Sequence, residues 1–193
     1  MNKEINRYLK DKNFTDPQLV DRLIVSSFLK INDILVNENV FIKSFIISED
    51  KTEVESLKKF IEIININGFK FDFEALIELF EFVISPDEKV VTGAIYTPIN
   101  IRTFIINQVF KNINFTDSAR IADIACGCGS FLYDLAIYIH NISGHTYTQI
   151  LKNNLFGLDI QEYSIIRTKI LLSLLAIQNG EDIPILEFNL FVG

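Results

Sequence analysis

The sequence predicts an α/β protein in which a helical N-terminal part is followed by a parallel sheet. In the first part apolar residues recur at helical spacing, whereas after Pro86 short apolar runs alternate with helical stretches. The runs cover residues 120–126, 154–160 and 183–192 and are nearly continuous, as strands buried on both faces are. This βαβαβ order is typical of a parallel sheet with helices on both faces.

The N-terminal part is expected to form a domain of helices. Asp16 followed by Pro17 is a typical helix start, because aspartate caps the first turn and proline suits the first helical position. Asn67-Gly68 is a typical helix end. The expected helices run from Gln18 to about Val36, from Asp50 to Asn67, and from Asp72 to Ser85.

The remainder of the chain is expected to form the α/β domain. Its helices are predicted from Ile99 to about Phe110, from Phe131 to about Ile139, and from Glu162 to about Ala176. We place the domain boundary near residues 86–92, which gives a helical domain over 1–88 and a second domain over 89–193.

The charge balance argues against a DNA-gripping surface on this chain. The net charge is −7: residues 1–88 hold 11 Lys/Arg and 17 Asp/Glu, and residues 89–193 hold 7 and 8. Phosphate contacts supply most non-specific affinity for a duplex, and no basic patch stands out. No uncharged apolar run reaches the ~18 residues of a membrane span, and the polar start is unlike a signal peptide. We therefore expect a cytoplasmic protein.

The stretch Ile121 to Leu132, IADIACGCGSFL, predicts a ligand loop. Ligands of parallel α/β sheets bind beyond the carboxyl ends of the strands, and the first strand ends at Asp123. Gly127 and Gly129 carry no Cβ atom that would keep a ligand from the backbone. Asp159 at the tip of the second strand is the usual type of partner for ribose hydroxyls. The pattern indicates a nucleoside ligand, with a plain βα turn as the structural alternative.

A dinucleotide ligand is less well supported. The fingerprint G-x-G-x-x-G requires a third small residue, which lets the helix pack closely on the strand. Leu132 occupies that position, so we expect the helix to be held away from the strand.

The cysteines allow a metal site as an alternative. Cys126, Cys128, His140 and His145 are the only Cys and His residues, in the order C-x-C and H-x₄-H. One residue between the cysteines is too few for a zinc knuckle, and a disulfide at this spacing would be strained. A catalytic thiol lacks an obvious histidine partner. We expect no metal, and two small side chains packed around the loop.

At these residues the sequence resembles the N6-adenine DNA methyltransferases, above all the modification subunits of type I restriction–modification systems and related type II enzymes. DIACGCGSFL is similar to their D-P-A-C-G-S-G-x-F-L signature, with Ile124 for the proline and Cys128 for the serine. Three further segments follow the order of that family: GAIYTP at 93–98, LFGLDI at 155–160 and EFNLFVG at 187–193.

The resemblance implies the first half of a Rossmann-like class I methyltransferase fold that binds S-adenosylmethionine. Asp123, Ala125, Gly127 and Gly129 would hold the methionine moiety with Thr97 nearby, Asp159 the ribose, and Phe131 and Ile160 the pocket wall. The full set of cofactor-binding residues that it implies is Tyr96, Thr97, Pro98, Asp123, Ala125, Cys126, Gly127, Gly129, Phe131, Asp159 and Ile160.

The catalytic motif of that family, [N/D/S]-P-P-[Y/F/W], is not in the sequence. The four prolines are Pro17, Pro86, Pro98 and Pro184, and no two are adjacent. We therefore expect a truncated N-terminal piece that is inactive by itself and holds no catalytic residue. DNA would be read by a recognition domain or specificity subunit outside this chain, with a restriction subunit as a further partner.

Two other functions remain open at this point. The chain could belong to an S-adenosylmethionine-dependent methyltransferase that acts on RNA, protein or a small molecule. It could also be a non-catalytic helical interaction module with a degenerate nucleotide fold.

Overall fold

The computed structural model describes residues 3–13, 17–83, 97–111, 113 and 115–193. The chain divides into two compact units, Met1–Ala94 and Ile95–Gly193. The expected domain boundary at 86–92 lies outside the described residues and stays a prediction.

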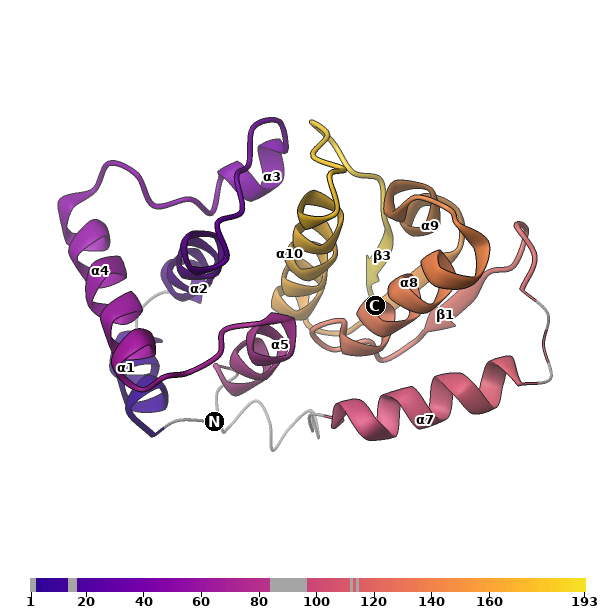
Figure 1. Ribbon diagram of the computed structural model, residues 1–193, viewed down its shortest axis with the longest axis horizontal. Helices are drawn as coiled ribbons and strands as arrows, with labels where there is room; N and C mark the ends of the chain where they lie inside the picture. The colour runs from indigo at the N-terminus through magenta and orange to yellow at the C-terminus, as the bar shows by residue number, and fades with distance from the viewer. Residues whose placement is uncertain (1–2, 14–16, 84–96, 112, 114) are drawn as a thin grey trace. The chain divides into compact units, whose positions relative to one another are not determined.

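The first unit is helical, as predicted (Figure 1). Its described helices are α1 (Lys3–Asn13), α2 (Pro17–Ile31), α3 (Val40–Lys43), α4 (Lys51–Ile66) and α5 (Phe73–Phe82). The predicted caps of two helices are present: the Asp50 side chain accepts a hydrogen bond from the Glu53 amide, and Asp72 accepts one from Ala75. The core gathers aromatic rings, among them Phe28, which is 5.4 Å from Phe71 between ring centroids.

Three details of this unit differ from the sequence prediction. Helices α1 and α3 were not predicted, and α2 ends at Ile31 instead of Val36. The early end has a local cause, because Asp33 adopts a left-handed backbone conformation with φ +52°. The Ile34 amide then donates to the carbonyl of Leu29 at 3.0 Å, which closes the helix.

The second unit confirms a mixed fold with a parallel sheet. Its elements are α7 (Ile99–Phe110), β1 (Ile121–Asp123), α8 (Ser130–Ser143), α9 (Tyr147–Asn153), β2 (Leu155–Asp159), α10 (Glu162–Gln178) and β3 (Asn189–Val192). The three strands are parallel in the order β1-β2-β3, with Asp123 opposite Gly157 and Asp159 opposite Val192. Leu155 and Gly157 are buried while Leu158 is 36% exposed, so helices on both faces stay a prediction.

The predicted third strand is shorter than expected. Only Asn189–Val192 is a strand, and the residues from Ile183 to Phe188 have no strand structure. Pro184 has no N–H group for a ladder hydrogen bond, and Ile185 beside it is 75% exposed. Continuous hydrophobicity alone therefore overestimated the strand.

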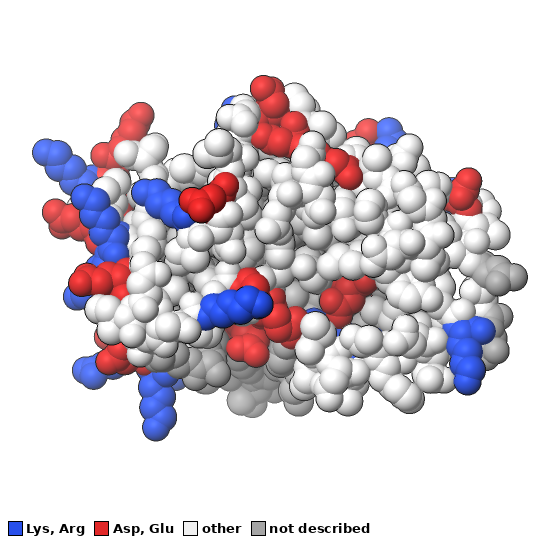
Figure 2. Space-filling view, viewed as in Figure 1, with Lys and Arg blue, Asp and Glu red and all other residues white. Residues whose placement is uncertain are grey.

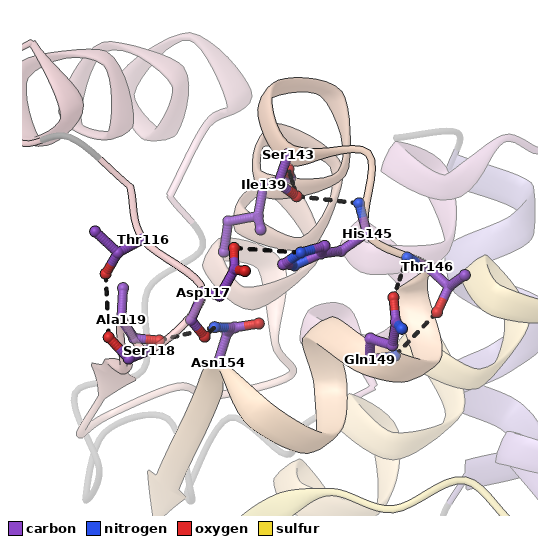
Figure 3. Close-up of polar contacts among 10 residues, drawn as sticks. All are labelled: Thr116, Asp117, Ser118, Ala119, Ile139, Ser143, His145, Thr146, Gln149 and Asn154. Atoms are coloured by element: carbon purple, nitrogen blue, oxygen red, sulfur yellow. Dashed lines mark hydrogen bonds and ion pairs between the residues drawn. The ribbon is translucent and has the colours of Figure 1, made fainter.

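Polar contacts at the amino ends of β1 and β2 set the register of the sheet (Figure 3). The Asn154 amide group donates to the carbonyls of Asp117 and Ala119 at 3.1 and 2.8 Å, and the Ile121 amide donates to the Asn154 carbonyl at 2.8 Å. Next to them, Thr146 and Gln149 form a capping box that starts α9. The polar segment between the first two strands is thus structured, and it fixes where β2 begins.

Candidate functional site

The glycine turn lies at the carboxyl edge of the sheet, between β1 and α8. Asp123 ends β1, residues 124–129 form the turn, and α8 begins at Ser130. Ile124 is 78% exposed and Ala125 is also exposed, so the outer part of the turn faces solvent. Asp123 and Asp159 are half-buried at the ends of neighbouring strands.

The turn has the backbone conformation that glycine favours. Gly127 and Gly129 have φ values of +53° and +86°, in the left-handed region that other residues rarely adopt. Gly129 is the residue immediately before α8, and its amide donates to the Cys126 carbonyl at 2.9 Å. The glycines predicted from sequence are therefore required by the shape of the turn itself.

Asp159 fastens the turn to the end of β2. Its Oδ2 accepts a hydrogen bond from the Gly127 amide at 2.9 Å, and its Oδ1 accepts one from the Gln161 amide at 2.9 Å. A backbone bond adds to this, from the Cys126 amide to the Leu158 carbonyl at 3.0 Å. Gly127 and Asp159 are 32 residues apart in the sequence but in direct contact. The glycine turn and the end of β2 therefore form one continuous site.

Asp123 is an acidic group in an unfavourable setting. Burial raises the pKa of its carboxyl group above the usual value, and the negative charge of Asp159 raises it further. A hydrogen bond from the Ala125 amide at 3.2 Å works in the opposite direction. A cationic ligand group beside Asp123 would favour its ionised form.

Helix α10 contributes a residue that the sequence reasoning missed. Thr168 is fully buried, and its hydroxyl group donates to the Gly127 carbonyl at 2.9 Å. A Cβ atom on Gly129 would lie 2.7 Å from Thr168 Cγ2, so this side chain fills the space that the glycine leaves. The available signal was a hydroxyl residue within the apolar stretch IIRTKILL.

Gly157 in β2 accommodates the bulk of Leu132. A Cβ atom at Gly157 would lie 2.8 Å from Leu132 Cδ1 and 2.5 Å from Leu190 Cδ2. The small residue needed for close packing of helix and sheet is thus on the neighbouring strand, and not at the third position of the fingerprint. Leu132 is fully buried in this arrangement.

The cysteines pack inside the turn, and the histidines lie elsewhere. Cys126 and Cys128 are both buried and unbridged. Burial, helped by the charges of Asp123 and Asp159, raises the pKa of the Cys126 thiol to about 12, so it is protonated at neutral pH. His140 and His145 lie at the far end of α8, a 14-residue helix about 20 Å long.

The histidines already have partners there. His140 Nδ1 lies 2.7 Å from the His145 carbonyl. Figure 3 shows the second contact, in which His145 Nε2 lies 3.3 Å from the Asp117 carboxylate. Within the described ranges, no group of three or more His, Cys, Asp and Glu side chains is arranged to hold a metal ion.

A buried arginine connects the segment Thr97-Pro98, which precedes α7, to helix α8. The Arg102 guanidinium donates through Nη1 to the Thr97 carbonyl at 2.6 Å and through Nε to Asp134 Oδ2 at 2.7 Å. Arg102 is fully buried, although it is the only charged residue in the sequence of α7. Sequence reasoning missed both Arg102 and Asp134, and that lone charge was the available signal.

The remaining predicted residues have less defined surroundings. Tyr96 lies outside the described residues, and Pro98 is exposed at the start of α7. Phe131 is half-buried in the first turn of α8, and Ile160 is 65% exposed directly after β2. The structure therefore brings together Asp123, Ala125, Cys126, Gly127, Gly129 and Asp159, with Thr97 connected to α8.

These features define a parallel α/β domain with a glycine turn and two carboxylates at the carboxyl edge of its sheet. A family model described as N-6 DNA Methylase matches residues 73–185, more than half of the 193 residues. The chain belongs to this family. The match begins at Phe73, the first residue of α5, so it includes one helix of the first unit. No curated protein matches the sequence.

Across the residues that the structure describes, no helix combines the length and the apolar character that crossing a membrane requires.

Proposed function

We propose that the chain binds S-adenosylmethionine at the glycine turn and forms the cofactor-binding part of an adenine-specific DNA methyltransferase. The observation that carries this proposal is the 2.9 Å contact between the Gly127 amide and Asp159, at the carboxyl edge of a parallel sheet. In a chain of the N-6 DNA Methylase family, such an edge is where a nucleoside cofactor is expected.

The chemistry of the residues fits this cofactor. Each carboxylate oxygen of Asp159 accepts one backbone N–H and retains a lone pair, which suits the two ribose hydroxyls. Asp123 can pair with the ammonium group of the methionine moiety, which would relieve its unfavourable burial. Ala125, Cys126, Gly127 and Gly129 would present backbone to the cofactor. When bound, the cofactor supplies a methyl group on a sulfonium centre.

Other residues would complete the site. We propose that Phe131 and Ile160 contact the adenosyl part, and that Tyr96, Thr97 and Pro98 contribute from the segment before α7. Together these elements would represent the first half of a Rossmann-like class I fold. The order β1-β2-β3 supports this, because it agrees with strands 3-2-1 of that sheet.

We further propose that the chain acts within a restriction–modification system and does not transfer the methyl group by itself. Its sequence holds no adjacent prolines, so the tetrapeptide that would position the adenine amine is not among these residues. Recognition of the DNA target would rest with a separate domain or specificity subunit, beside a restriction subunit. Because the substrate is DNA, the expected location is the cytoplasm.

Replacement of Asp159 tests the cofactor site. We expect Asp159→Ala to weaken binding of S-adenosylhomocysteine by about 1–3 kcal/mol, because two backbone amides and the ribose hydroxyls lose their acceptor. Isothermal calorimetry measures this, with thermal unfolding as a check that the variant is folded. Asp159→Asn keeps one acceptor oxygen, so its affinity for S-adenosylhomocysteine should lie between those of the parent protein and Asp159→Ala.

A matched control uses a carboxylate far from the turn. Glu187 pairs with Lys152 at 2.6 Å on the surface, before β3 begins. Glu187→Gln should leave the affinity unchanged. Equal affinities for the parent protein and folded Asp159→Ala would refute the ribose role, and failure of the parent to bind the ligand would refute the proposed function as a whole.

A further inference from the structure

We propose that Thr168 of α10 is a positioning residue that holds the glycine turn in the conformation ready for its ligand. This inference rests on the proposed function, since it assigns to α10 a part in cofactor binding. It is carried by two contacts of one fully buried side chain, a hydrogen bond to Gly127 and close packing against Gly129.

Two hydrogen bonds hold the peptide units on the two sides of Gly127, and the bond from Thr168 is one of them. The Gly127 carbonyl accepts from Thr168 Oγ1 at 2.9 Å, while the Gly127 amide donates to Asp159 at 2.9 Å. Gly127 has φ +53°, and glycine is the residue with the greatest backbone freedom to lose on ordering. Two side chains from different elements, Asp159 of β2 and Thr168 of α10, therefore hold a glycine of the turn in place.

The direction of this hydrogen bond is unusual for a hydroxyl residue within a helix. Such side chains often donate to a carbonyl four residues earlier in their own helix. Ser27 does so to Leu23 at 2.7 Å, and Ser143 does so to Ile139 at 2.7 Å. Thr168 instead donates to a residue 41 positions away, in another element. The hydroxyl group thus serves the turn and not its own helix.

The packing contact is separable from the hydrogen bond. A Cβ atom on Gly129 would lie 2.7 Å from Thr168 Cγ2 and 2.8 Å from Oγ1, so the methyl and hydroxyl groups both occupy that space. Valine has the shape of threonine without the hydroxyl, whereas serine keeps the hydroxyl without the methyl. The two variants therefore distinguish a hydrogen-bonding role from a packing role.

Loss of the hydroxyl should lower the fraction of molecules whose turn is ready to bind. The apparent dissociation constant rises in inverse proportion to that fraction. A hydrogen bond with a net contribution of typical size corresponds to a change of about two- to tenfold. The effect should be confined to the turn, because Asp159 and the sheet ladder remain in place.

The deciding experiment compares three variants by amide hydrogen exchange and by calorimetry with S-adenosylhomocysteine. We expect Thr168→Val to speed exchange of the Gly127 and Gly129 amides and to weaken binding, each about two- to tenfold. Exchange in β2 should be unchanged, and Thr168→Ser should restore both quantities to near the parent values. Ser173→Ala is the matched control, because Ser173 is buried in α10 and its hydroxyl has no hydrogen-bond partner among the described residues.

The outcomes separate this inference from the proposed function. Unchanged exchange at the turn in Thr168→Val, or equal losses in the valine and serine variants, would overturn the role of the hydroxyl. If the parent protein does not bind S-adenosylhomocysteine, the proposed function fails, and with it the claim that Thr168 acts on a cofactor site. The exchange data would then still decide whether Thr168 holds the turn.

Discussion

At the scale of single residues, the site places the carboxyl group of Asp123 where folding alone would not favour its ionised form. The pKa of Asp123 is raised first by burial and then by the charge of Asp159. The unfolded chain therefore loses this proton at lower pH than the folded chain does. The stability linked to Asp123 is fully present below its ordinary pKa of 3.8 and is lost as the pH rises through the raised folded value.

Asp123→Asn should therefore stabilise the protein at neutral pH while weakening the ligand site. Asparagine keeps an acceptor for the Ala125 amide but removes the buried charge. We expect a gain of about 0.5–2 kcal/mol in the free energy of unfolding at pH 7, typical of changes that relieve a functional site. Urea denaturation at pH 7 measures it, and the gain should shrink as the pH falls from the raised folded pKa of Asp123 towards 3.8.

The same variant should bind S-adenosylhomocysteine more weakly, because the ammonium group loses its ionic partner. If the variant is less stable than the parent at pH 7, burial of the ionised Asp123 carboxyl group does not cost stability, and this explanation is wrong.

The places of the turn residues in the fold could be predicted, whereas the residues that support the turn could not, and the binding roles stay predictions. Asp123, Gly127, Gly129 and Asp159 stand at strand ends and turns, where local sequence carries the signal. Thr168 acts on a residue 41 positions away, a pairing that only the packing of α10 on the turn creates. Arg102 and Asp134, likewise, are 32 positions apart. Long-range pairs of this kind leave only a weak signal in the sequence, namely a polar residue in an otherwise apolar helix.

At the scale of elements, Gly157 sets how closely α8 and β3 approach the middle of the sheet. The side chains of Leu132 and Leu190 converge on it, and Cys126 Sγ would lie 3.2 Å from a Cβ atom placed there. Leu132 and Cys126 are buried and Leu190 is half-buried, so an added methyl group could enter only if these side chains shifted.

Gly157→Ala should destabilise the second unit by overpacking. We expect a loss of about 1–3 kcal/mol in the free energy of unfolding, measured by urea denaturation. Leu190→Val removes the nearest atom, 2.5 Å from the position of the new Cβ, so the double variant should lose less than the sum of the two single variants. Strict additivity would show that the conflict lies elsewhere.

The order of elements could be read from the sequence more readily than their ends. The alternation of helices and short strands was correct because apolar periodicity reports it directly. Helix α2 ends early at the left-handed Asp33, and β3 is shortened after Pro184, two backbone effects that hydrophobicity does not report. The short helix α3 depends on an Asn39 cap, a signal that spans only four residues.

At the scale of the whole molecule, the charge balance argues against a DNA-binding surface on this chain. The net charge is −7, and on the face shown in Figure 2 Lys and Arg side chains are interspersed with Asp and Glu. A surface that holds a duplex neutralises several phosphates at once, which requires clustered positive charge.

We therefore expect these 193 residues to bind duplex DNA only weakly. The dissociation constant for a short fluorescent duplex should exceed about 10⁻⁴ M at physiological salt, at the weak end of non-specific binding. Fluorescence anisotropy at two salt concentrations measures both the affinity and its salt dependence. Micromolar binding with a steep salt dependence would show that this part of the protein contacts the DNA backbone directly.

The relative lengths of the strands have a consequence for behaviour at high concentration. The outer strands of the sheet, β1 and β3, have three and four residues, whereas the central β2 has five. An outer strand offers its free backbone groups as a template for a second molecule, and a short one offers few of them. Within the described part of the chain, these short strands therefore offer few free backbone groups for edge-to-edge association.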